Sequence, residues 1–90
     1  MRLEWKPMAL EDREKIMNYI ARDNPQAAIK LDDAFEAAAE RAKDNPDRYK
    51  SGRLKNTQEI VVHPHYILVY KAYGETVTIL RVLHTSQQWP

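Results

Sequence analysis

The sequence predicts an α+β fold, with an N-terminal strand, an antiparallel pair of helices and then a three-stranded antiparallel meander. Two observations support this prediction. Residues 59–90 contain three runs of β-branched and aromatic residues separated by turn signals, which is typical of consecutive strands. Residues 8–43 carry apolar side chains at helical spacing on both sides of an Asn-Pro pair. The chain has 90 residues, so we expect a single domain, 1–90.

The N-terminal segment Arg2 to Lys6 alternates polar and apolar residues, which indicates a short amphipathic strand. Pro7 ends this strand and suits the first turn of a helix, which we expect from Met8 to Arg22. The expected apolar stripe of this helix consists of Leu10, Met17 and Ile20, with Ile16 beside it. Residues 11–15 are all charged and are expected to face the solvent.

Asn24 and Pro25 are a cap and a first helical residue, so a second helix is expected from Pro25 to Lys43. Its predicted buried stripe is Ala28, Leu31, Phe35, Ala38 and Ala42. The short connection between the helices predicts an antiparallel hairpin. Asn45-Pro46-Asp47 then begins a loop.

The predicted strands of the meander cover residues 60–62, 66–73 and 76–83, with Gly74 at the tight connection between the last two. Regular alternation in the third strand would place Arg81 and His84 on opposite faces. Both faces of the meander are largely apolar, so something must cover each of them, either this chain or a partner. Because two helices can cover only one face, we expect an apolar trough on the other that binds another polypeptide.

Composition and charge exclude several classes of function. The formal net charge of +1 gives no global nucleic-acid signature, but residues 48–55 hold four cations and no acid. This basic loop is either a phosphate-binding element or a solvated loop, and the sequence leaves both readings open. The absence of cysteine excludes disulfides and thiol catalysis. No apolar run approaches a membrane span, so we expect a soluble cytoplasmic protein that does not bind membranes.

Several side chains are candidates for chemistry or binding. His63 and His65 lack a third metal ligand, so we expect no metal site. His84 is either a general acid or base or, more commonly, a surface histidine at a strand end. Tyrosines such as Tyr70 either stack on bases or belong to the core. Trp89 lies in a polar tail, so it either packs on the sheet or docks on a partner.

The stretch TQEIVVHPHYILVYKAYGETVTILRVLHTSQQWP, preceded by AAERAKDNPDRYKSGR, resembles the ParE branch of the RelE/ParE toxins. These are the toxin halves of type II toxin–antitoxin modules, also called plasmid stabilisation proteins. The resemblance covers essentially the whole chain and implies a RelE/ParE-like β-α-α-β-β-β fold. It implies no cofactor, and it implies a cognate antitoxin whose flexible segment wraps the toxin in a hetero-oligomer.

The resemblance to ParE implies inhibition of DNA gyrase and growth arrest, without catalysis. Residues expected to contact the target or the antitoxin are Arg53, Tyr70, Arg81, His84, Gln87, Gln88 and Trp89. The RelE branch instead cleaves mRNA on the ribosome, and in that alternative Arg81 and His84 would be catalytic. Many of those ribonucleases carry arginine in the central strand where this chain has Ile67, so the ribonuclease set is incomplete.

Overall fold

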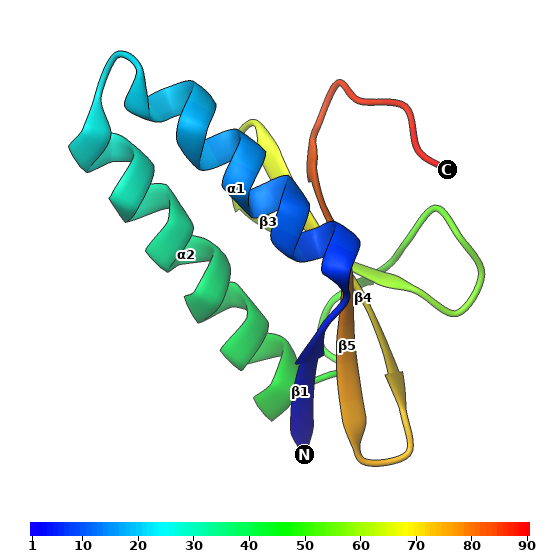
Figure 1. The fold of residues 1–90 in the computed structure, drawn as a ribbon. Helices are drawn as coiled ribbons and strands as arrows, with labels where there is room; N and C mark the ends of the chain where they lie inside the picture. The colour runs from blue at the N-terminus through cyan, green and yellow to red at the C-terminus, as the bar shows by residue number, and fades with distance from the viewer.

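The computed structural model describes residues 1–90. The elements, in order, are β1 (Arg2–Trp5), α1 (Pro7–Ala21), α2 (Pro25–Asp44), β2 (Lys50–Ser51), β3 (Gln58–His63), β4 (Tyr66–Tyr73) and β5 (Thr76–His84). The strands form one sheet in the order β1-β5-β4-β3-β2. The two helices lie side by side on one face, while the 52–57 loop and the C-terminal tail lie on the other side (Figure 1). The predicted α+β class, helix hairpin and meander are confirmed.

Strand β1 pairs in parallel with β5, a partner that the sequence does not reveal. The pairing ends where the Lys6 N–H donates to the Ile79 carbonyl at 2.9 Å. Pro7 then occupies the first turn of α1 and directs the chain away from the sheet. Because β1 stops there, residues of β5 beyond Ile79 have an open edge on the side of α1.

The short strand β2 lies where the sequence predicts only a loop. Lys50 and Ser51 pair with Glu59 and Gln58, so β3 begins at Gln58, two residues earlier than expected. Nothing in the local pattern indicates a strand, because the segment is basic and lacks apolar alternation. The pairing is set by β3, whose outer edge would otherwise remain unpaired.

The helix pair covers one face of the sheet through a stripe of small residues and one ring. Phe35 is fully buried, and the buried alanines of α2 are Ala28, Ala38, Ala39 and Ala42. The predicted stripe of α2 is confirmed at Ala28, Phe35, Ala38 and Ala42, whereas Leu31 is only partly buried. The stripe of α1 is not confirmed, because Leu10 is 48% exposed and Ala9 is buried in its place. The alanine lets α1 approach β5 closely, and this rotates the helix so that Asp12 and Arg13 are partly buried.

Arg13 therefore does not face the solvent as predicted. Its Nε and Nη2 atoms donate to the two carboxylate oxygens of Asp32 on α2, each at 2.8 Å. Its guanidinium also lies over the Trp5 ring, 4.6 Å from the centroid. Hydrogen bonding to Asp32 raises the pKa of Arg13, with burial opposing. This one side chain thus connects α1, α2 and β1.

A bulge in β5 changes which side chains face the helices. Val69 pairs with Arg81 and Tyr70 with Ile79, so Leu80 has no partner across β4. Ile79 and Val82 consequently both join the core under the helices, whereas Leu83 packs on the far face. Regular alternation would place Leu83 on the same face as Ile79 and Val82 on the other face, and the structure reverses both because the bulge shifts the pattern by one residue.

The expected apolar trough on the far face is not open at its centre. Ile67, Val69 and Leu83 form a buried cluster there, and Trp89 of the C-terminal tail packs against it. The chain itself therefore covers the part of this face that the sequence assigned to a partner. Large apolar side chains that remain exposed lie mainly elsewhere, including Leu10, Tyr19 and Ile29 on the helices and Val61 and Tyr73 on the sheet.

Tyr70 is a core residue rather than a contact residue. Its ring is fully buried, and its hydroxyl donates to the Pro46 carbonyl at 2.6 Å, which ties the loop after α2 to the sheet. A side chain with no exposed surface cannot touch a target, so its assignment to target or antitoxin binding is withdrawn. Burial raises the pKa of Tyr70 to about 12.

The raised pKa predicts a loss of stability in alkali. Between the ordinary tyrosine pKa near 10 and the folded value of about 12, the folded chain binds more protons than the unfolded chain. Stability is therefore fully present below about pH 10 and falls as the pH rises through this window, by roughly 2 kcal/mol. Urea unfolding of wild type and Tyr70→Phe at several pH values tests this. At pH 7 the free energy of unfolding of Tyr70→Phe should be about 1 kcal/mol lower than that of wild type. In alkali it should fall less steeply with pH than that of wild type.

Candidate functional site

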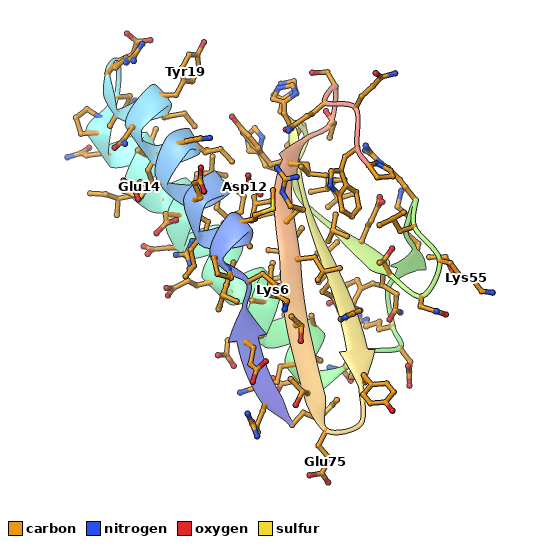
Figure 2. The ribbon with its side chains drawn as sticks, turned by 45° about the vertical axis from the view of Figure 1, so that its right-hand side comes forward. Lys6, Asp12, Glu14, Tyr19, Lys55 and Glu75 are labelled. Atoms are coloured by element: carbon orange, nitrogen blue, oxygen red, sulfur yellow. The ribbon has the colours of Figure 1, made fainter.

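The candidate site is a pocket between α1 and the C-terminal half of β5. Its cavity volume is ≈ 470 Å³. It is lined by Asp12, Lys15, Ile16, Tyr19, Tyr66, Arg81, Val82, His84 and Gln87. In Figure 2, Asp12 points from α1 toward the sheet, and Tyr19 lies further along the same helix. The pocket therefore draws its side chains from α1, the start of β4, the end of β5 and the tail.

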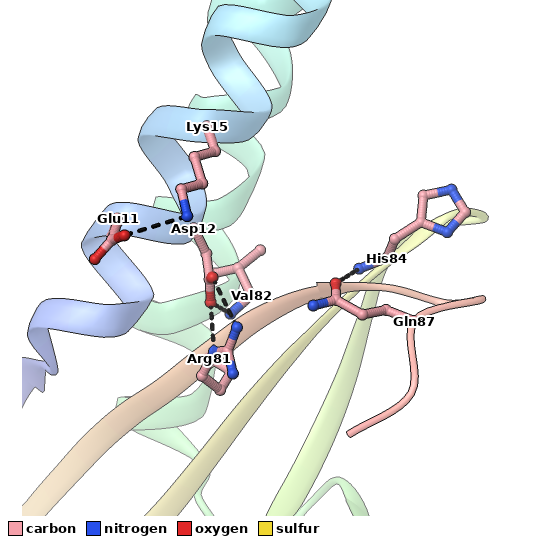
Figure 3. Close-up of polar contacts among 7 residues, drawn as sticks. All are labelled: Glu11, Asp12, Lys15, Arg81, Val82, His84 and Gln87. Carbon is pink, nitrogen blue, oxygen red and sulfur yellow. Dashed lines mark hydrogen bonds and ion pairs between the residues drawn. The ribbon is translucent and has the colours of Figure 1, made fainter. Parts of the chain in front are cut away.

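Asp12 and Arg81 form the central contact of the pocket. Arg81 Nε and Nη2 donate to the two oxygens of the Asp12 carboxylate at 2.8 and 3.0 Å, in a bidentate pair (Figure 3). The Val82 N–H, which lies on the edge that β1 leaves open, donates to the same carboxylate at 2.9 Å. Both charged side chains are largely buried, with 13% and 15% of their side-chain areas exposed. The Asp12 carboxylate thus accepts the Val82 N–H hydrogen bond that a neighbouring strand would otherwise accept, and it neutralises the charge of Arg81.

Arg81 and His84 line the same pocket although the backbone directs their side chains to opposite faces. This is possible because the Arg81 guanidinium turns around the open edge of β5 toward Asp12. The prediction that strand geometry separates the two residues is therefore wrong at the level of the side chains. Hydrogen bonding to Asp12 raises the pKa of Arg81, with burial opposing, so the guanidinium stays charged and paired.

His84 is held by its neighbours in the tail and by other rings. Its Nδ1 atom lies 3.1 Å from the Ser86 nitrogen, which donates to it, and 2.7 Å from the Ser86 hydroxyl. The ring stacks on His65 with a centroid distance of 5.6 Å and an interplanar angle of 7°. It also meets the edge of Tyr66 at 5.3 Å. Packing on both sides leaves His84 a fixed orientation at the mouth of the pocket.

Tyr66 links this histidine to the core. Its ring packs edge-on against Phe35 at a centroid distance of 5.9 Å, and burial raises the pKa of its phenol. The remaining cation of the pocket, Lys15, pairs with Glu11 at 3.2 Å. The pocket therefore presents a phenol, an imidazole, a paired guanidinium and an exposed lysine that forms a surface ion pair.

The C-terminal tail brings together three of the sequence-predicted site residues, Arg53, His84 and Gln87. Arg53 Nη1 donates to the Gln87 carbonyl at 3.0 Å, and the Gln87 side-chain oxygen accepts from the His84 N–H at 3.3 Å. Glu59, which is 6% exposed, anchors Arg53 by accepting from its backbone N–H at 3.1 Å. Gln88 is exposed, and Trp89 packs on the far-face cluster. The basic loop thus holds the tail against the sheet.

Removal of the Trp89 ring should uncover the far-face cluster. We expect Trp89→Ala to lower the free energy of unfolding by about 1 to 2 kcal/mol, because part of a large apolar area returns to water. Urea unfolding gives the value, and an environment-sensitive dye reports the exposed cluster. Gln88→Ala is the matched control, since this exposed neighbour should change stability by less than about 0.5 kcal/mol.

Sequence reasoning missed Asp12 because it lies in a run of five charged residues that was assigned to the solvent. A signal was nevertheless present. Ala9, Asp12, Ile16 and Tyr19 follow one another at helical spacing, so one carboxylate falls on the face that packs against the sheet. A single acid on such a face indicates a partner cation, and Arg81 is that cation.

No helix in the structure is both long and apolar enough to cross a membrane. No group of three or more potential ligands among His, Cys, Asp and Glu side chains is arranged to hold a metal ion.

Comparison with known proteins agrees with the fold and with the resemblance. The family model described as the ParE toxin of the type II toxin–antitoxin system parDE matches residues 3–89. Y4kP of Sinorhizobium fredii is 34% identical over 90 residues, covering 99% of this chain and 93% of that protein. Toxin RelE2 of Caulobacter vibrioides is 32% identical over 85 residues, covering 92% and 93%.

Among solved structures, the chromosomal ParDE toxin–antitoxin system from P. aeruginosa contains a chain with a TM-score of 0.82 and 15% identity. The match covers 93% of this chain and 95% of that chain, which confirms the RelE/ParE-like fold. The family match spans almost the whole sequence and includes the strands and helix that form the pocket. This chain therefore belongs to the ParE toxin family of type II toxin–antitoxin systems, within the RelE/ParE superfamily.

Proposed function

We propose that this toxin inhibits DNA gyrase by binding it, without catalysing a reaction, and that a cognate antitoxin neutralises it in a hetero-oligomer. The observation that supports a non-catalytic mode is the bidentate pair of Arg81 and Asp12. Asp12 accepts from two Arg81 nitrogens and neutralises the guanidinium, whereas an arginine that stabilises a cleaved phosphate directs its charge at that phosphate. Ile67, at the position where many ribonucleases of the superfamily carry arginine, is buried and apolar.

The antitoxin is proposed from the family and from the similar P. aeruginosa structure, which is described as a ParDE system. The chain's own tail covers the centre of the far face, so an antitoxin segment that binds there contacts the tail rather than the buried cluster. The exposed apolar side chains of the helices, Leu10, Tyr19 and Ile29, are available for it. The residues that remain proposed contacts with the target or the antitoxin are Arg53, Arg81, His84, Gln87, Gln88 and Trp89.

A supercoiling assay with purified gyrase tests the proposed target. We expect micromolar toxin to inhibit supercoiling, and His84→Ala to weaken this inhibition by about tenfold at most, because the change removes one contact and no proton transfer is involved. Circular dichroism of both proteins confirms that they are folded. A folded toxin that leaves supercoiling unchanged at micromolar concentration would refute the gyrase proposal.

A ribosome-dependent mRNA endonuclease is the second candidate, because His84, Tyr66 and Arg81 share one pocket. In this mechanism His84 acts as the acid and Arg81, released from Asp12, stabilises the phosphate. Mapping of transcript ends after induction separates the two functions. Cuts at fixed codon positions that vanish in His84→Ala would favour the nuclease, and intact transcripts in growth-arrested cells would exclude it.

A further inference from the structure

A second hollow lies on the far face of the sheet, at the opposite end of β4 from the Arg81 pocket. Its cavity volume is ≈ 970 Å³, and its walls are the loop between β2 and β3 and the last residues of β4. Figure 2 shows Lys55 projecting from this loop, on the side of the sheet away from the helices. Neither the gyrase proposal nor the ribonuclease alternative uses this surface.

The hollow is cationic. Lys55 and Lys71 line it, and none of its lining residues is acidic. The loop also belongs to residues 48–55, which carry four cations without an acid. The nearest acid of β3, Glu59, is buried and its carboxylate lies 3.5 Å from Arg53 Nε, so the charge of Glu59 is offset by Arg53 rather than by the two lysines. A ligand that complements this surface carries negative charge.

An exposed aromatic ring stands at the rim of the hollow. Tyr73 is 86% exposed, more than any other large hydrophobic side chain of the protein. It follows Lys71 by two residues on β4, so both side chains leave the same face, about 7 Å apart along the strand. A flat, solvated ring next to two cations is the arrangement on which unpaired bases stack while phosphates are neutralised.

The loop that carries Lys55 is closed by its own hydrogen bonds. The Gly52 N–H donates to the Thr57 carbonyl at 2.8 Å, and the Thr57 hydroxyl donates to the Leu54 carbonyl at 2.6 Å. Asn56 has a positive φ of 66°, as a tight turn requires. A side chain at Gly52 would collide with the Thr57 hydroxyl. Lys55 is thus presented from an ordered turn, which reduces the entropic cost of binding.

We propose that this hollow binds a single strand of DNA, with Lys55 and Lys71 on phosphates and Tyr73 stacked on a base. The strand is single because a paired base in a duplex does not expose its face to a tyrosine. The choice of DNA over RNA rests on the proposed gyrase target, whose substrate is DNA. The site itself is separate from the Arg81 pocket, so the toxin can hold DNA without using its tail.

Fluorescence anisotropy of a short labelled oligothymidylate with the purified chain tests this proposal. We expect saturable binding at low salt, and Lys55→Glu/Lys71→Glu should weaken it about tenfold or more and reduce the salt slope by about 1.4. Tyr73→Ala should weaken binding by at least about fivefold, whereas Tyr73→Phe should bind within about twofold of wild type because it retains the stacking ring.

Matched controls separate this site from general charge and from other rings. Lys30→Glu changes an exposed lysine on α2, and Tyr19→Ala removes an exposed ring on α1. Each should bind as wild type does. No binding of the oligonucleotide, or equal weakening by Lys30→Glu and by a single hollow variant such as Lys71→Glu, would overturn the proposal. So would tighter binding of oligouridylate or of a duplex. The anisotropy assay contains no gyrase. A failure to bind DNA in this assay would therefore not decide whether the toxin inhibits supercoiling.

Discussion

Asp12→Ala should lower the free energy of unfolding by about 3 kcal/mol, a large effect for a surface helix. The substitution leaves the Arg81 guanidinium largely buried without its partner and leaves the Val82 N–H without an acceptor. Either loss alone is destabilising, because a buried charge or donor that cannot return to water loses its solvation. Urea unfolding of the purified chain gives the value.

A double-mutant cycle measures the interaction energy between Asp12 and Arg81. Asp12→Ala/Arg81→Met removes both charges, so it should recover part of the stability lost in Asp12→Ala. Glu14→Ala is the control on the same helix, because Glu14 is exposed and forms no ion pair in the structure. Its effect should stay within about 0.5 kcal/mol. Additive effects of Asp12 and Arg81 would show that the two side chains do not interact in solution.

Phe35→Ala should destabilise the chain by about 3 to 5 kcal/mol. Phe35 is fully buried between α2 and the sheet, and the alanines around it cannot move inward enough to fill the space of a ring. Small domains have only roughly 5 to 15 kcal/mol of stability, so this single change should bring the chain close to unfolding at 37 °C. Thermal and urea unfolding followed by circular dichroism measure it.

The same change should also disturb the pocket, because the Phe35 ring supports Tyr66 by an edge contact and Tyr66 supports His84. Phe35→Leu retains most of the volume and should cost less than about 1.5 kcal/mol. In this conservative variant the NMR signals of His84 and Tyr66 should shift, while those of the distant Tyr73 should not. A Phe35→Ala protein as stable as wild type would contradict the placement of this ring in the core.

The sequence alone predicts those elements in which the local pattern of apolar residues matches the residues that are buried in the structure. The bounds of β4 and the start of α2 match the prediction, because Tyr66–Tyr73 is rich in aromatic and β-branched residues and Asn24-Pro25 is a strong helix start. The buried stripe of α2 is also predictable, since its apolar residues repeat at helical spacing and the charged residues of the helix lie at other positions.

The features that sequence reasoning missed depend on contacts between distant segments. The parallel pairing of β1 with β5 leaves the edge of β5 open after Ile79, and that opening gives Asp12 its role. The bulge at Leu80 changes the faces of later residues in the strand, which no alternation rule anticipates. The tail covers the far face because Arg53 holds Gln87 across 34 positions of sequence.

The candidate site was accordingly predicted in part. Arg81, His84 and Gln87 do line one pocket, but Tyr70 belongs to the core and Asp12 was assigned to the solvent. The pattern of charges along a helix does not show whether a carboxylate pairs with a cation outside that helix. The role of Asp12 could therefore be identified only from the structure.

The NMR signal of the Arg81 guanidinium tests most directly whether Asp12 occupies this arginine. With ¹⁵N-labelled toxin, we expect the Arg81 Nε–H signal to be protected from exchange and not to move when inorganic phosphate or a short RNA is added. Asp12→Asn should make the same signal respond to phosphate. A wild-type Arg81 signal that exchanges freely and shifts on addition of RNA would show that Asp12 does not occupy Arg81 and that the pocket holds a phosphate-binding arginine.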